Sequence, residues 1–512
     1  MHLCVGNTRS MSSYFNKFQT YRLCSVIKMS LYSKTENKRF EHDSIGEVLI
    51  EPHDSLYGVQ TVRSKKNFCF SEISSTTMPR EIIDSILIIK KAAAKVNFDC
   101  GKLAEDLSAA IIGSIDKIRN DISEEPCRFK QLFPLAIWQT GSGTQTNMNV
   151  NEVVANFGNR ESFQKDYGTY QPLHPNDHIN MSQSSNDVFP SSINIAVLQL
   201  CEPFLLDTFK NFLESLHNKS RKFKDIIKIG RTHCQDAVPM TLGNEFLAFY
   251  QIMKESYDRI LLSLRDLQSI PIGGTAIGTG LNSPKGFDEK ICSTINDFID
   301  LKMLKLSPAV NKYAEISSKS RLSAFHSTLA VFATEIIKFT NDIKILSSGP
   351  LCGFNELNLP ANEPGSSIMP GKVNPTQCEM LAMIAAQIIG NNQAIQLANL
   401  GSQFQLNTYM PMLAYNVILS IHLLKDGLRN FTNNCLCGIQ VNEAQTERNV
   451  QKSPMLITCL NKHLGYENCA RIVKLSLKSN MSLKEAGKKL DLISEEDFDR
   501  LVRPREMALP SE

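Results

Sequence analysis

The 512-residue sequence lacks the features that mark several common classes of protein. Its 14 cysteines include no Cys-x-x-Cys pair and no zinc-ligand spacing, which argues against a structural zinc site. No apolar run reaches the roughly 18 residues that a membrane-spanning helix needs. The formal net charge is only +3, so we expect no general attraction to nucleic acid or to an acidic membrane. Without a secretory signal, the cysteines are interpreted as reduced thiols of an intracellular protein.

The first 35 residues contain no aspartate or glutamate, but they carry lysine and arginine among many serines and tyrosines. A basic, hydroxyl-rich segment without acidic residues is typical of a mitochondrial presequence. The alternatives are a disordered extension without a targeting role, or upstream sequence before a start at Met11 or Met29. We therefore expect residues 1–38 to be an N-terminal extension and the protein to be mitochondrial, with a cytoplasmic form as the second option.

Apolar residues three and four positions apart dominate the remaining chain and predict a mainly α-helical fold. The clearest pattern runs over 322–346, and a second runs over 242–267. Further helices are predicted over 81–97, 103–120, 193–226, 376–398 and 411–429. Long stripes of this kind indicate helices that pack at shallow angles in a bundle. We also expect a kink at Pro203 and, at IGEVLIEP and YGVQTVRS, a short strand and turn before the first helices.

The same patterns suggest three domains after the extension. Residues 39–180 form a mixed, mostly helical domain, 181–443 a central helical bundle, and 444–512 a small helical domain. More apolar surface is present than one bundle axis requires, which favours burial between subunits of an oligomer.

Four separated blocks combine glycines, hydroxyls and amides with the expected start of a helix. They are Ser142-Gly143-Thr144, Ser184-Ser185-Asn186, Arg231-Thr232-His233, which is predicted to lie in a loop, and GSSIMPGKVNPTQCE at 365–379. In the last block, Asn374, Pro375 and Gln377 predict a helix start with Asn374 as the N-cap. A loop rich in hydrogen-bond donors that leads into the positive end of a helix favours the binding of a small anion.

Each block taken alone has a more ordinary explanation. The last one fails the phosphate-loop pattern, because five residues separate Gly365 from Gly371 and Val373 follows Lys372. The Gly-x-Gly of the first block lacks a third glycine and a βαβ setting. The serine-rich block is a common N-cap sequence, and a lone histidine such as His233 is more often structural than catalytic.

Taken together and in order, the four blocks resemble the conserved regions of class II fumarases, within the fumarase and aspartase superfamily. GGTAIGTGLN at 273–282, LGYENCARI and VRPREM extend the resemblance over nearly all of the chain after the extension. The resemblance implies a three-domain fold whose central bundle of five long helices forms the core of a homotetramer. It also implies active sites shared by three subunits, with no metal, no cofactor, and no nucleic-acid or membrane partner.

The resemblance further implies the roles of particular residues. Ser366 would be the base that takes the C3 proton of L-malate, and His233, paired with Glu379, would handle the other proton through a bound water. The substrate-binding residues that it implies are Ser142, Gly143, Thr144, Ser184, Ser185, Asn186, Thr232, Ser367, Lys372, Val373 and Asn374. The residues of a second, lesser dicarboxylate site would be His174, Pro175, Asn176 and Asp177. Gln171 and Met181 stand near that second site where family members usually carry positive charge.

The implied reaction is the reversible hydration of fumarate to L-malate through a carbanion whose charge spreads into the adjacent carboxylate. Preorganised hydrogen-bond donors would stabilise this charge, and each is worth about 3 kcal/mol when it is aimed at an oxyanion. An aspartate ammonia-lyase would typically carry glutamine in place of His233, and argininosuccinate or adenylosuccinate lyases usually carry it in place of Gly371. The remaining alternative is a non-catalytic, crystallin-like structural protein, against which the intact Ser366, Lys372 and Glu379 argue.

Overall fold

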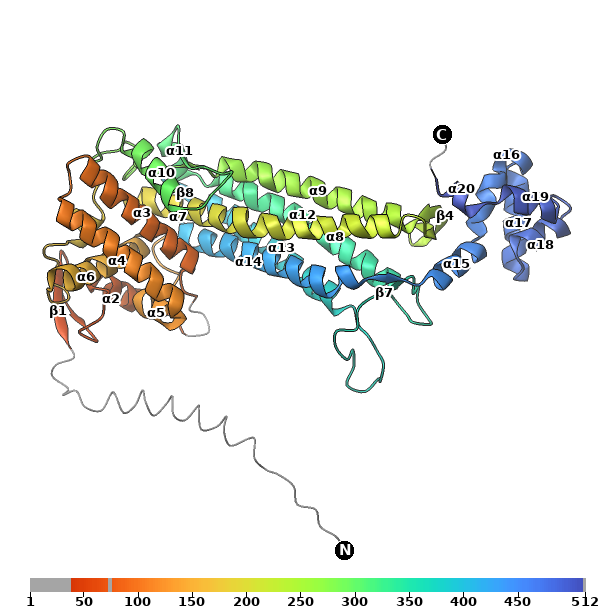
Figure 1. Ribbon diagram of the computed structural model, residues 1–512, viewed down its shortest axis with the longest axis horizontal. Helices are drawn as coiled ribbons and strands as arrows, with labels where there is room; N and C mark the ends of the chain where they lie inside the picture. The colour runs from red at the N-terminus through yellow and green to blue at the C-terminus, as the bar shows by residue number, and fades with distance from the viewer. Residues whose placement is uncertain (1–37, 72–75, 510–512) are drawn as a thin grey trace, which may run out of the picture. The chain divides into compact units, whose positions relative to one another are not determined.

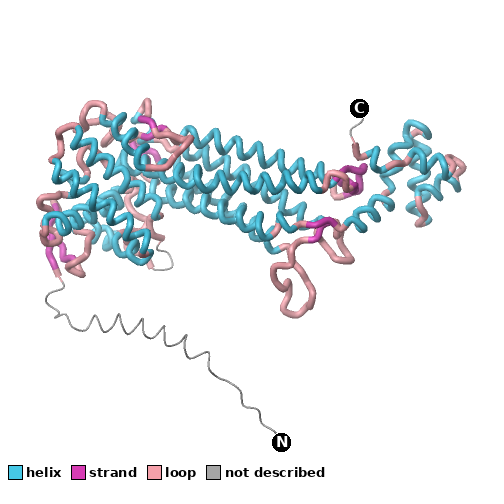
Figure 2. The backbone as a smooth tube through the Cα atoms, viewed as in Figure 1, coloured by secondary structure: helices cyan, strands magenta, loops and turns pink. Residues whose placement is uncertain are grey.

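The computed structural model describes residues 38–71 and 76–509, so residues 1–37 of the predicted extension lie outside the described residues. The described chain forms two compact units. One contains the residues up to Ser185 together with Asn282–Phe287, and the other contains Asn186–Leu281 and the residues from Asp288 onward. Helices dominate both (Figure 2), which confirms the prediction of a mainly α-helical chain. The domain boundaries at 180 and 443 stay predictions.

The first unit is a helical layer with one short β-hairpin. Its elements are β1 Arg39–Asp43, β2 Gly46–Ile50, α2 Val59–Asn67, α3 Arg80–Asp99, α4 Glu105–Glu124, α5 Pro126–Leu132, α6 Thr144–Phe163 and the π-helical turn η1 Pro175–Ile179. Strands β1 and β2 pair antiparallel, and α4 packs against both α3 and α6. Helix α3 confirms the helix predicted over 81–97, and its apolar residues Ile82, Ile86, Ile89 and Ala93 are buried.

Strand β2 confirms the strand predicted at IGEVLIEP, but helix α2 begins inside YGVQTVRS, where a turn was predicted. The Glu152 carboxylate from α6 accepts hydrogen bonds from the N–H groups of Gly58 (2.8 Å), Gln60 (2.7 Å) and Thr61 (3.2 Å). These are the donors that the first turn of a helix leaves without an intrahelical partner. A carboxylate remote in sequence therefore provides the cap that the local sequence lacks.

The second unit begins with a very long helix that carries the predicted irregularity at Pro203. Helix α7, Ser185–Leu200, continues through the π-helical turn η2, Cys201–Leu205, into α8, Leu206–Lys222. Pro203 lies in the π-helical turn, as expected for a residue without an N–H to donate. The 38-residue helix is long and apolar enough to cross a membrane, but 83% of its most apolar window is buried in the protein, which is the behaviour of a core helix.

Four more long helices run alongside one another in the same bundle as α8 (Figure 1). They are α9 Leu242–Asp266, α12 Ser320–Leu346, α13 Thr376–Asn399 and α14 Met410–Asn434. Helix α8 contacts α9 and α14, α9 contacts α12, and α13 contacts α12 and α14. Every member of the two clearest predicted stripes is buried, including Phe249 on α9 and Phe325 and Phe332 on α12.

Aromatic rings join the bundle helices through their core. The Phe339 ring of α12 lies 6.1 Å from Phe212 of α8, 5.0 Å from Phe249 of α9 and 5.6 Å from Phe431 of α14, measured between centroids. All three contacts are edge-to-face, the arrangement that the ring quadrupoles favour.

Short elements connect the bundle helices and complete the C-terminal part. They are β3 Ile227–Thr232, β4 Gln235–Thr241, β5 Ser269–Ile270, α10 Phe287–Phe298, β6 Ser307–Pro308, α11 Lys312–Ser317, β7 Leu357–Asn358, β8 Ser402–Gln403, β9 Leu406–Asn407, η3 Leu436–Gly438, β10 Gln440–Val441, α15 Glu443–Lys452, η4 Pro454–Leu460, α16 Asn461–Leu464, α17 Tyr466–Ser479, α18 Leu483–Lys489, α19 Glu495–Leu501 and α20 Pro504–Met507. Strand β5 pairs parallel with β6, and the other pairs, β3 with β4, β7 with β10 and β8 with β9, are antiparallel.

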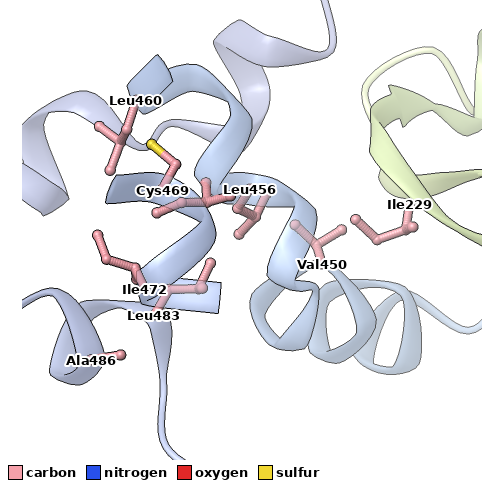
Figure 3. Packing of buried hydrophobic residues seen from close by; sticks show 9 residues of the cluster. Ile229, Val450, Leu456, Leu460, Cys469, Ile472, Leu483 and Ala486 are labelled. Atoms are coloured by element: carbon pink, nitrogen blue, oxygen red, sulfur yellow. The ribbon is translucent and has the colours of Figure 1, made fainter. Parts of the chain in front are cut away.

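The C-terminal helices share a small core with the β3–β4 hairpin. Figure 3 shows Ile229 of β3 beside Val450 of α15, with Leu456 next to them. Ile472 of α17 and Ala486 of α18 continue the same cluster. This apolar contact fixes the base of the hairpin that carries Thr232 and His233.

Candidate active site

Thr232 and His233 stand at the tip of a β-hairpin, so the prediction that this block is a loop is wrong. Thr232 pairs with Gln235 across the two strands, and His233 and Cys234 form the connecting turn. Both turn residues have positive φ, +56° and +59°, as a type I′ turn requires. The usual sequence for this turn is Asn-Gly, so a His-Cys pair does not reveal it. Thr232 and His233 are both exposed.

The block at 365–379 forms a closed loop before α13. The Gly365 N–H donates to the Lys372 carbonyl at 2.8 Å, and the Asn374 side-chain amide donates to the Gly365 carbonyl at 2.7 Å. The prediction that Asn374 is the N-cap is therefore wrong. Helix α13 begins at Thr376 with Pro375 in the capping position, because the Asn374 amide closes the loop instead.

The Ser366 hydroxyl oxygen lies at the focus of two backbone N–H groups. Ile368 N–H donates to Ser366 Oγ at 3.2 Å, and Met369 N–H donates to it at 3.1 Å. Two donors aimed at one oxygen favour that oxygen in its anionic form, since hydrogen bonds to the charged form stabilise it. The loop thus holds the Ser366 hydroxyl oxygen in one position through two backbone hydrogen bonds. Ser367, Lys372 and Val373 are exposed on the same loop.

Glu379 lies in the first turn of α13 and is exposed. Over the described residues, 38–71 and 76–509, no hydrogen bond or ion pair joins it to His233. One chain therefore does not form the predicted pair by itself.

The first block opens helix α6. Gly143 takes the capping position with φ +74°. Residues other than glycine rarely adopt this left-handed backbone conformation. Ser142 Oγ and Thr144 Oγ1 lie 2.9 Å apart across it. In the same unit, the Asn147 side-chain amide donates to Ser185 Oγ at 3.0 Å. The first unit thus brings Ser142, Gly143 and Thr144 to one helix start, and it connects the same helix to Ser185.

Asn186 belongs to the second unit and contacts the GGTAIGTGLN segment. Its side-chain amide donates to the Ala276 carbonyl at 2.8 Å. The neighbouring Asp187 carboxylate accepts from the N–H groups of Gly273 (3.0 Å) and Thr275 (2.9 Å). Asp187 was not predicted as a functional residue, and these contacts assign it to holding the segment against α7.

The predicted second site forms the π-helical turn η1. His174 Nδ1 accepts hydrogen bonds from the N–H groups of Asn176 (3.3 Å) and Asp177 (3.2 Å), and Pro175 begins the turn. Burial lowers the pKa of the nearby His178, and the charge of Asp177 only partly opposes this effect. The motif therefore contains two N–H groups that point at one acceptor, and in this structure that acceptor is the Nδ1 atom of His174.

The predicted site residues of the second unit do not meet within one chain. Asn186 lies in the first turn of the helix Ser185–Lys222, and Thr232 and His233 follow its far end. A 38-residue helix is roughly 55 Å long at about 1.5 Å per residue. A small dicarboxylate cannot reach both ends of it, so a site that uses all three residues requires more than one chain.

Known proteins share both the sequence and the fold. A lyase family model matches residues 49–390, and a model of the fumarase C C-terminus matches 456–508. The class II fumarate hydratase of Helicobacter pylori strain J99 is 44% identical over 474 residues, covering 92% of this chain and 99% of that protein. The class II fumarate hydratase of Wigglesworthia glossinidia brevipalpis is 45% identical over 469 residues, covering 92% and 98%. The crystal structure of a class II fumarase from Schistosoma mansoni superposes with a TM-score of 0.87 at 39% identity, covering 93% of this chain and 100% of that one.

The helical fold and the match over most of the chain define a lyase. Within the lyases, the chain belongs to the class II fumarate hydratase family.

Proposed function

We propose that the protein catalyses the reversible hydration of fumarate to L-malate, a step of the tricarboxylic acid cycle. Membership of the class II fumarate hydratase family supports this reaction. The observation that carries the proposal is the Ser366 loop, in which two backbone N–H groups point at one hydroxyl oxygen. That arrangement suits proton abstraction by serine, which an unperturbed hydroxyl performs poorly near neutral pH.

In the direction from malate, Ser366 takes the C3 proton and leaves a carbanion whose negative charge spreads into the neighbouring carboxylate. Lys372, on the same loop, supplies a positive charge for this intermediate. Asn186 and the hydroxyl groups of Ser142 and Thr144 are donors of the type that oxyanion stabilisation needs. The remaining proposed binding groups are Gly143, Ser184, Ser185, Thr232, Ser367, Val373 and Asn374.

The departing hydroxyl group needs a proton, and we assign this role to His233 acting through a water. Glu379 of another chain would accept a hydrogen bond from the imidazole, which favours the imidazolium and fixes the ring orientation. The exposure of both side chains in one chain supports a contact made between chains.

We propose a homotetramer in which three chains contribute to each active site. The length of the helix between Asn186 and His233 supports a shared site. Helix α13 also exposes large apolar side chains, with Met383 67% and Leu397 62% exposed, and Leu400, directly after the helix, is 78% exposed. A helix that is apolar on several faces is normally buried, so the bundle offers surface for other copies of the chain.

We propose that the second site binds a dicarboxylate weakly, through the N–H groups of Asn176 and Asp177. Two donors converging on one acceptor support this role, with a carboxylate oxygen replacing the ring nitrogen of His174. Calorimetric titration of fumarate into a Ser366→Ala enzyme, with and without Asp177→Pro, tests the proposal. Loss of a second, weaker binding phase in the double variant is expected, and an unchanged isotherm would contradict it.

An ultraviolet assay tests the proposed reaction. Purified protein is offered L-malate and L-aspartate separately, without metal or nucleotide, and fumarate is followed by its absorbance. We expect fumarate from L-malate alone. Fumarate from L-aspartate would instead assign an ammonia-lyase activity, and no product from either substrate would favour the crystallin-like alternative.

We also propose that residues 1–38 direct the protein to mitochondria, because the segment is basic and its first 35 residues contain no aspartate or glutamate. A fluorescent protein fused behind residues 1–38 tests this proposal by microscopy. Mitochondrial fluorescence is expected, and diffuse fluorescence would contradict it.

A further inference from the structure

A cluster of charged residues lies beneath the hairpin that carries Thr232 and His233. Lys228 and Arg231 extend from β3 toward the buried Glu356, and Glu245 of α9 completes the cluster. Two cations and two carboxylates balance one another, as buried charges require. None of the four was predicted as a functional residue.

Arg231 and Glu356 form the most directional contact in the cluster. The guanidinium donates from Nη2 to Glu356 Oε1 at 2.5 Å and from Nη1 to Oε2 at 3.2 Å, and it lies 4.3 Å above the Phe354 ring. Asn449 of α15 adds a third hydrogen bond to Oε1 at 3.0 Å. The Glu356 side chain is 0% exposed. A bidentate pair of this kind fixes orientation as well as distance.

The backbone of Glu356 is held on both sides. Its N–H donates to the Leu346 carbonyl at the end of α12 at 2.8 Å, and its carbonyl accepts from Asn442 N–H at 2.9 Å. Glu356 therefore starts the segment that leads to Ser366 from a fixed point. Arg231, which donates two hydrogen bonds to the Glu356 carboxylate, directly precedes Thr232 in the sequence.

Glu356 remains a carboxylate under ordinary conditions. Burial alone would raise the pKa of Glu356, but the hydrogen bond from Arg231 and the positive charge of Lys228 outweigh it and hold the pKa below its usual value. Lys228 makes its shorter contacts with Glu245, 2.8 Å to each oxygen, and stays 3.5 Å from Glu356. The two carboxylates thus have different main partners in one cluster.

The hairpin tip needs such a support. The β3–β4 register shifts between Ile229 and Arg231, and His233 and Cys234 both have left-handed φ values that cost free energy in residues other than glycine. A conformation of this kind persists only where the surroundings hold it in place.

We propose that Arg231 and Glu356 are positioning residues that hold the Thr232–His233 hairpin in a fixed relation to the Ser366 loop. This inference rests on the proposed hydratase function, in which both segments carry catalytic residues. Neither Arg231 nor Glu356 acts on the substrate in this scheme. Their pair couples the two segments, so a change on one side alters the mobility of the other.

The test compares three variants. Arg231→Lys keeps the charge but loses the two-pronged contact, and Glu356→Gln keeps the shape but loses the charge. Glu245→Gln is the matched control, because it removes a carboxylate charge from the same cluster without touching Arg231. The measurements are kcat and KM for L-malate, thermal stability, and hydrogen–deuterium exchange over residues 359–377.

Arg231→Lys and Glu356→Gln are expected to lower kcat by about 100-fold with little change in KM, the size of loss that a small misplacement of catalytic groups causes. Arg231→Lys should also speed amide exchange over 359–377, although the substitution lies on the hairpin side. Glu245→Gln should lower the melting temperature while kcat and exchange in that segment stay unchanged.

Unchanged kcat and exchange in Arg231→Lys would overturn the proposal, and so would equal losses in Glu245→Gln. If Glu356→Gln fails to fold, kcat and amide exchange over 359–377 in Arg231→Lys test the proposal. The exchange measurement needs no turnover. If wild-type protein fails to convert L-malate, the proposed function is wrong, and exchange still decides whether the pair couples the two segments.

Discussion

The buried side chain of His326 leads us to predict that the free energy of unfolding falls in mild acid. Its ring lies in the core of the bundle on α12 and is 0% exposed. Nδ1 is 3.0 Å from Asn392 Oδ1, so the neutral tautomer that donates from Nδ1 satisfies this contact. Nε2 is buried and has no hydrogen-bond partner among the described residues. A proton added there would create a charge without a partner.

Burial lowers the pKa of His326 from 6.5 to about 4, and the hydrogen bond to Asn392 only partly opposes it. The folded pKa lies below the unfolded one, so the unfolded chain takes up the proton first. Stability is therefore complete above pH 6.5 and is lost as the pH falls from 6.5 toward 4. At about 1.4 kcal/mol per pKa unit, the loss amounts to about 3 kcal/mol per chain at pH 4.

Urea unfolding of wild type and His326→Asn at several pH values between 4 and 7 measures this loss. The variant removes the titrating ring, so its stability should fall about 3 kcal/mol less over that range, whatever its stability at pH 7. His463→Asn, the same substitution at an exposed position on α16, is the control and should follow the wild type. Parallel pH profiles for wild type and His326→Asn would refute the reasoning.

Further predictions concern the active site and the supports of the fold. Ser366→Ala should abolish conversion of L-malate without changing the mass of the assembly in light scattering; normal turnover would remove the assignment of Ser366 as base. His233→Asn should lower kcat by roughly 10²- to 10⁴-fold, and an unaffected rate would make His233 structural. Glu152→Gln should reduce the free energy of unfolding by about 1–3 kcal/mol in urea, since an NH₂ group would face the N–H donors of α2; equal stability would refute the capping role. Leu397→Asp should shift the protein to smaller assemblies in sedimentation, whereas an intact tetramer would show that this face of α13 is not in the interface.

The helices could be predicted because their signal is local. The stripes at 242–267 and 322–346 repeat at the helical period, and burial of one face follows directly from that spacing. The four polar blocks were visible for a similar reason, since each is a short run of uncommon composition. The prediction that they share one site came only from their order along the chain and its resemblance to a family.

The wrong predictions share a different physical cause. Each concerns a group whose partner is distant in sequence or absent from the local pattern. Asn374 was expected to cap α13, but its amide turns back to the Gly365 carbonyl. The start of α2 depends on Glu152, a carboxylate from α6. The His233–Cys234 turn lacks the residues that usually mark it, and the pairing of β3 with β4 produces it.

By itself, the sequence determined the helical class and the long apolar stripes, because both depend on residue type and short-range spacing. Tertiary structure alone decided that Glu356 accepts the hydrogen bonds of Arg231 and that the Glu152 carboxylate caps α2, because these partners lie far apart in the sequence. These features depend on distances between atoms. Such distances arise only when the whole chain packs.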